Sequence, residues 1–188
     1  MKALLRGSDL IGLPVVTLGG DDIAEVRDVL FDPAKGEVIG FTLNKRGKLA
    51  RRMKESLPRD HVAAIGPAAV MVNDETALSP ELPHASGEGS GNVLGDRVLT
   101  DAGVLIGTVT DAVIDTGSGA VVGYEIAPAD EPSGRNGRRS YVPLSDTCAV
   151  SGEALIVPSA TVDYVTSDLA GFGEAVDRFR DLLHRKAP

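Results

Sequence analysis

The chain has 188 residues, of which 43% are hydrophobic and 24% are charged, as is usual for a globular protein. Only 4% are aromatic and Trp is absent, which favours small aliphatic cores over a large aromatic-lined ligand cavity. The net charge of −8 argues against a surface that binds nucleic acid over its whole extent. The single cysteine, Cys148, cannot form an intramolecular disulfide, and no apolar run approaches the length of a transmembrane helix. We therefore expect a cytoplasmic protein with no transmembrane segment.

The first part of the chain is predicted to form short β-strands joined by tight turns. We expect one turn at Gly19-Gly20-Asp21 and another at residues 32–36, where Pro33 takes the second position and Gly36 can adopt a positive φ. The expected strands are residues 15–17, 23–31, 38–43, 62–65 and 69–72. Five or six short strands with glycine at the bends are typical of a small closed or nearly closed β-barrel.

Residues 44–54 carry six positive charges and no negative ones, so the rest of the chain sums to −14. The equivalent segment of the second half is also basic, but Asp130 and Glu131 offset its charge. The simpler interpretation is a solvated loop that balances an acidic barrel. The alternative is an edge that binds RNA, acidic protein or lipid headgroups, and without interleaved aromatic residues any nucleic-acid contact would be to phosphates. The candidate anion- or partner-binding residues are Lys45, Arg46, Lys48, Arg51, Arg52, Lys54, Arg135, Arg138 and Arg139.

The sequence contains an internal repeat. Residues 10–43 align with residues 93–126 at a shift of 83 without a gap, and 11 of these 34 pairs are identical. A second block, from Leu57-Pro58 onward, aligns with Val142-Pro143 at a shift of 85. Because this period is much longer than that of a solenoid, we expect each copy to be a domain with its own core. The expected parts are a first barrel at 1–77, a linker at 78–91, a second barrel at 92–160 and a helical segment at 161–188.

Two aspartates and a glycine recur in both copies and are interpreted as structural turn residues. Their side chains are expected to accept hydrogen bonds from nearby backbone N–H groups, while the glycine allows the turn. These residues are Asp28, Asp32 and Gly36 in the first copy and Asp111, Asp115 and Gly119 in the second.

The segment Asp115-Thr116-Gly117 has the local pattern of an aspartic-protease active site. That chemistry needs two carboxylates close enough to share one proton. The first copy has Asp32-Pro33-Ala34 at the same place, and a turn explains both aspartates. We therefore predict no catalytic residue. The histidines and Cys148 show neither metal-ligand spacing nor a nucleophile–base pair, so no metal and no cofactor are expected.

The C-terminus is predicted to be an amphipathic helix, with Ser167 or Asp168 near its start. Its apolar stripe either packs on a barrel or stays exposed, where it would recruit a partner or pair two copies of the chain. The candidate interface residues are Leu169, Phe172, Val176, Phe179 and Leu183.

The segments 10–20 and 26–40, with 57–66, resemble a PRC-barrel domain, and residues 93–95, 107–115 and 141–143 resemble a second one. The second copy departs from the pattern at Thr116 and at Val150-Ser151. The resemblance covers about residues 8–73 and 91–158. It implies a mainly β protein of two tandem small barrels, used for docking to other macromolecules, and the family has no shared catalytic residues to carry over.

The expected function is therefore that of a non-enzymatic adaptor that docks to another macromolecule, with a protein as the favoured partner. The alternative is an RNA- or anionic-surface-binding module that acts through residues 45–54. An aspartic-type hydrolase at Asp115 has the least support. A homodimer through the C-terminal helix or the barrel edges is also compatible with the sequence.

Overall fold

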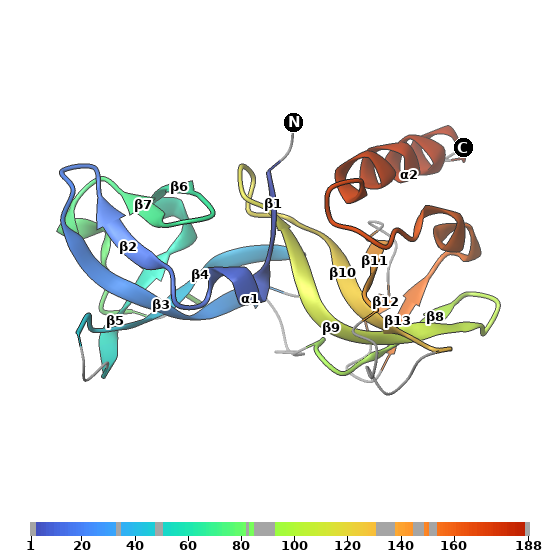
Figure 1. The fold of residues 1–188 in the computed structure, drawn as a ribbon, viewed down its shortest axis with the longest axis horizontal. Helices are drawn as coiled ribbons and strands as arrows, with labels where there is room; N and C mark the ends of the chain where they lie inside the picture. The colour runs from blue at the N-terminus through green and yellow to red at the C-terminus, as the bar shows by residue number, and fades with distance from the viewer. Residues whose placement is uncertain are drawn as a thin grey trace. The chain divides into compact units, whose positions relative to one another are not determined.

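The computed structural model describes residues 3–32, 35–47, 51–81, 83–84, 93–130, 138–144, 149–150 and 154–186. The chain divides into two compact units, each built on its own β-sheet (Figure 1). The first unit comprises Met1–Ser90 with Ile114–Ala120, and the second comprises Gly91–Val113 with Val121–Pro188. In the described part of the chain, no helix has the length and apolar composition needed to cross a bilayer.

The first sheet has the strand order β5-β4-β3-β2-β7-β6, in which only the β2–β7 pair is parallel. Its core consists of aliphatic side chains and Phe41, which is fully buried. Its strands are β2 (Pro14–Thr17), β3 (Asp22–Asp32), β4 (Glu37–Asn44), β5 (Arg52–Pro58), β6 (Val62–Ile65) and β7 (Val70–Val72). The short elements around them are β1 (Leu4–Arg6), α1 (Gly7–Leu10), η1 (Arg59–His61) and η2 (Glu75–Ala77).

The second sheet repeats this order as β11-β10-β9-β8-β13-β12, and β1 pairs with β9 outside that path. Its strands are β8 (Arg97–Thr100), β9 (Leu105–Asp115), β10 (Val121–Pro128), β11 (Ser140–Pro143), β12 (Ala149–Val150) and β13 (Ala154–Val157). The 3-10 helix η3 (Ser159–Tyr164) and helix α2 (Phe172–Lys186) follow. The predicted mainly β class with a C-terminal helix is confirmed. The first strand path is open, however, because β5 and β6 are joined through η1 and are not paired with each other. In the described part of the second sheet, β11 and β12 likewise end the path without pairing with each other.

The strand registers confirm the repeat at both shifts. Gly40 of β4 pairs with Pro58 of β5, and Gly123 of β10 pairs with Pro143 of β11. The glycines are 83 residues apart and the prolines 85 apart, as the alignment predicts. The two additional residues in the second copy therefore lie between these paired strands.

The two paired glycines are sites of close backbone approach. A Cβ atom on Gly40 would lie 2.6 Å from the Leu57 carbonyl oxygen and 2.8 Å from Pro83 Cγ. On Gly123 it would lie 2.3 Å from the Val142 carbonyl oxygen and 2.4 Å from Phe172 Cζ. Glycine is required at both places because the neighbouring strand and the chain that follows each sheet occupy the space of a side chain.

The first residues of the predicted linker pack on the first sheet. Ser79 exchanges two backbone hydrogen bonds of 2.8 Å with Ser56 of β5, and the Ser56 hydroxyl donates to the Glu81 carbonyl. Ser56 is buried, so its backbone groups need these partners. The first residues of the expected linker, 78–91, therefore pack on the first sheet, and most of the others lie outside the described part of the chain.

Helix α2 begins at Phe172, and Asp168 accepts a 2.7 Å hydrogen bond from Gly171 N–H just before it. Phe172, Val176 and Phe179 are at most 1% exposed. The Phe172 ring lies 5.7 Å from that of Tyr141 in β11, and the Phe179 ring lies 5.2 Å from that of Tyr164 in η3. The alternative of an exposed stripe is wrong for these three residues, because the second unit's own β11 and η3 cover them. The other two candidates, Leu169 and Leu183, are partly buried.

Residues 114–120, the β9–β10 turn, belong to the first compact unit although their repeat lies in the second. Ile114 is fully buried in the core cluster of the first unit. Val38 N–H donates to the Gly119 carbonyl at 2.9 Å, and Thr116 N–H donates to the Ala3 carbonyl at 3.0 Å. The predicted boundaries, 1–77 and 92–160, assign this turn to the second domain, since sequence order alone does not show which core buries a hairpin tip.

We predict that Gly123→Ala lowers the free energy of unfolding by about 3 kcal/mol, because the new methyl overlaps a backbone carbonyl and the Phe172 ring. Gly103→Ala is the control: its φ is +79° and no atom lies within 4 Å of the added Cβ. That substitution should cost only about 1 kcal/mol, the cost of a left-handed residue. Urea unfolding followed by circular dichroism measures both values, and equal losses would contradict the assigned overlap.

Candidate functional site

The described residues of the basic segment, 44–47 and 51–54, lie at the end of the β4–β5 hairpin. Lys45 N–H donates to the Arg51 carbonyl at 2.8 Å, and Asn44 pairs with Arg52. This pairing brings Lys45 opposite Arg51, with Arg52 and Lys54 following along β5. Lys48 lies outside the described residues.

Arg46 is neutralised by two carboxylates of β3. Its Nη2 lies 2.7 Å from Asp22 Oδ2 and its Nη1 lies 3.0 Å from Glu25 Oε2. One guanidinium therefore bridges two acidic residues, which ties the hairpin to the strand next to β4. Arg46 acts as the anchor of the hairpin and contributes little free positive charge.

The other described cations of this segment have no such counter-charge among the residues that the structure describes. Lys45, Arg51, Arg52 and Lys54 are exposed, and none forms an ion pair with another residue of the described chain. We call these four residues the cationic cluster. Because like charges that face each other across a hairpin repel, their placement favours an external anion.

The second copy treats the equivalent position differently. Arg139, which aligns with Lys54, has its Nη1 at 3.5 Å from Glu125 Oε2. Glu125 is 5% exposed and also accepts hydrogen bonds from the Thr110 and Tyr141 hydroxyls, at 3.0 and 3.3 Å. In the first copy Thr42 stands in place of Glu125, so no carboxylate is available to Lys54 at that position. Of the other candidates, Arg138 is exposed and Arg135 lies outside the described residues.

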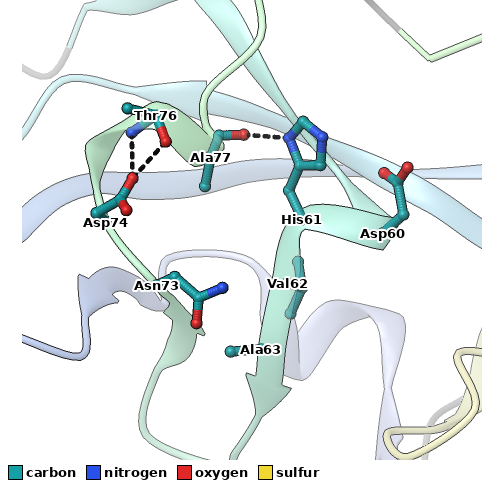
Figure 2. Close-up of a pocket in the computed structure, with 8 residues that line it drawn as sticks. All are labelled: Asp60, His61, Val62, Ala63, Asn73, Asp74, Thr76 and Ala77. Carbon is teal, nitrogen blue, oxygen red and sulfur yellow. Dashed lines mark hydrogen bonds between the residues drawn. The ribbon is translucent and has the colours of Figure 1, made fainter.

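A hollow of about 270 Å³ opens between the start of β6 and the segment after β7 (Figure 2). His61 Nδ1 lies 2.8 Å from the Ala77 carbonyl oxygen, and Asp74 accepts hydrogen bonds from Thr76 N–H and Oγ1. The Thr76 hydrogen bonds lower the pKa of Asp74. The lining also includes Asp60 and Asn73, but in Figure 2 the carboxylates of Asp60 and Asp74 do not converge. No group of three acidic, histidine or cysteine residues in the described chain is placed to hold a metal ion.

The two glycine turns hold their aspartates in local hydrogen bonds. Gly36 N–H donates to the Asp32 carbonyl and Gly119 N–H to the Asp115 carbonyl, each at 2.8 Å, and both glycines have positive φ. The side-chain Oδ1 of Asp115 accepts from Gly117 N–H at 2.9 Å, as in an Asx turn. No carboxylate of the described chain is hydrogen-bonded to Asp115.

A family model of the PRC-barrel domain matches residues 3–76 and again residues 88–163. The chain belongs to the PRC-barrel family. No curated protein matches the sequence. The two PRC-barrel domains indicate a binding or adaptor module, and the hairpin charges described above are one of the differences between them.

Asp28 and Asp111, predicted as turn residues of the two PRC barrels, lie inside strands β3 and β9. Asp28 accepts a 2.9 Å hydrogen bond from the Thr42 hydroxyl across the sheet, and Asp111 accepts a 2.8 Å bond from Ala112 N–H. The prediction misplaced them because each strand continues for 11 residues, up to the true turn at Asp32 or Asp115.

Sequence reasoning also missed the internal neutralisation of two candidate cations. Arg46 and Arg139 were grouped with their neighbours by charge alone. Their partners, Asp22, Glu25 and Glu125, are 14 or more residues away along the chain. For Arg46 the signal lies in the β3–β4 register, because Glu25 faces Asn44, the last residue of β4 and two residues before Arg46.

We predict that Asp115→Ala lowers the free energy of unfolding by about 1 kcal/mol through loss of the turn hydrogen bond. Asp115→Asn should cost much less, because its side-chain carbonyl still accepts from Gly117 N–H. Thermal unfolding of both variants checks this order. Peptidase activity at acidic pH that disappears in the Asn variant would contradict the structural role.

Proposed function

We propose that this PRC-barrel protein is a non-catalytic adaptor that docks onto another protein through the cationic cluster of its first barrel. The observation that carries the proposal is that Lys45, Arg51, Arg52 and Lys54 are exposed and have no counter-charge among the described residues, on a chain whose net charge is −8. A local positive site on an acidic protein orients an approaching anionic partner and excludes cationic ones.

The non-catalytic role is supported by how the described polar groups are used. Asp115 and Asp32 accept hydrogen bonds within turns, and His61 contacts the Ala77 carbonyl. Glu125 is occupied by Thr110, Tyr141 and Arg139. These groups serve the fold, and no pair of them has the geometry of an acid–base or nucleophile–base couple.

RNA is the second candidate partner, through the same cationic cluster. Its phosphates would match the charge, but residues 44–54 contain no aromatic side chain on which a base could stack. The protein partner is therefore preferred. We place the adaptor in the cytoplasm, since its single cysteine gives it no structural disulfide that would require an oxidising compartment. Self-association through α2 is not proposed, because its apolar stripe is covered.

The test is capture of partners from native cell lysate with immobilised full-length protein. Arg51→Glu/Arg52→Glu should lose the wild-type partner protein, and nuclease treatment should leave capture unchanged. Arg97→Glu/Arg185→Glu is the matched control, since both residues are exposed and the change in net charge is the same. Capture by the hairpin variant equal to wild type would refute docking at the cationic cluster, and capture that nuclease abolishes would favour RNA.

A further inference from the structure

The ion pairs of Arg46 within the hairpin indicate which chemistry a partner would need. Arg46 takes two carboxylates, Asp22 and Glu25, from a single extended strand, at 2.7 and 3.0 Å. Arg51 and Arg52 lie across the same hairpin end from Arg46, and no acidic residue of the described chain pairs with them in this way. An extended peptide with two carboxylates at similar spacing could therefore bind Arg51 and Arg52 as the carboxylates of β3 bind Arg46.

The surroundings of the cluster disfavour a long polyanion. Asp22 and Glu25 flank the hairpin on β3, and Glu55 is exposed beside Lys54 on β5. A nucleic acid or an anionic membrane needs a continuous positive surface, and these carboxylates interrupt it. A short acidic segment contacts only the cluster and avoids the flanking charges.

Strand addition is not the mode of contact. The outer edge of β5 is already paired at Ser56 by Ser79, and the β4–β5 register shifts between Thr42 and Asn44. Such irregularity and the charges at Arg52 and Lys54 are features that prevent edge pairing. Recognition must therefore depend on side chains.

We infer that the cationic cluster binds a short acidic segment of a partner protein, held through its side-chain carboxylates by Lys45, Arg51, Arg52 and Lys54. This inference rests on the proposed docking function and specifies the chemistry of the partner. The acidic pair Asp22 and Glu25 competes with that segment, because it withholds Arg46 from it.

The experiment measures fluorescence anisotropy of a labelled peptide in which Glu and Asp alternate with Ser, titrated with the full-length protein. A peptide with Gln and Asn in place of the acids is the neutral control, and an oligouridylate of similar length tests RNA. We expect binding of the acidic peptide only, weakened about tenfold or more by Arg51→Glu/Arg52→Glu and by salt. Arg97→Glu/Arg185→Glu should change it by less than about twofold, because these arginines do not belong to the cationic cluster.

A second variant makes the local claim falsifiable. Asp22→Asn/Glu25→Gln releases Arg46 and should tighten peptide binding by about threefold, because one more cation becomes available within the Debye length. Asp163→Asn/Asp181→Asn changes the net charge equally on the second unit and should have little effect. Equal effects of the two variants would overturn the inference, since binding would then follow net charge alone.

The failure of this inference is distinguishable from failure of the proposed function. If the acidic peptide does not bind while lysate capture still depends on Arg51 and Arg52, the cluster docks a partner of different chemistry and the acidic segment is refuted. If the oligouridylate binds more tightly than the peptide, RNA replaces it. If lysate capture is independent of Arg51 and Arg52, docking at the hairpin is itself refuted.

Discussion

Both sheets depend on one close approach between neighbouring strands, at Gly40 in the first copy and Gly123 in the second. A side chain at either position would overlap the carbonyl oxygen of the next strand. The absence of that side chain also makes room for whatever chain follows the sheet: Pro83 in the first copy and Phe172 in the second. The space beside the glycine is thus filled by a proline in one copy and by the first residue of helix α2 in the other. The burial of the α2 stripe follows from this geometry.

The two copies share this arrangement of strands but differ in the polar residues between β4 and β5 in the first copy and between β10 and β11 in the second. Glu125 is buried and draws Arg139, Tyr141 and Thr110 into one polar group. Thr42, at the equivalent position, donates one hydrogen bond from its neutral hydroxyl to Asp28. A buried carboxylate must be compensated, so the second copy uses its arginine internally. The first copy has no such demand, and its cations are free to face solvent.

The features that the sequence predicted well are those set by backbone geometry. The positive φ of Gly36 and Gly119 and the equal hydrogen bonds across their turns follow from glycine and aspartate at fixed spacing. The repeat shifts align Gly40 with Gly123 and Pro58 with Pro143, and the strand registers of the two sheets agree with that alignment. What could not be predicted depends on contacts between distant segments: the Arg46 ion pairs, the cover over Phe172, and the burial of Ile114 in the first unit's core. Composition and periodicity carry no information about which distant side chain completes such a contact.

Among the described residues, the anchoring of the hairpin by two carboxylates belongs to the first copy. Asp22 and Glu25 hold Arg46, and the aligned residues of the second copy are Leu105 and Thr108. Neither can bind a guanidinium, and Leu105 is itself 45% exposed. On the second hairpin, Arg139 is bound by the buried Glu125, which neutralises it. The acidic residues of β3 thus have two opposite effects. They lower the net positive charge of the hairpin, and they hold the hairpin that carries the exposed cations in place.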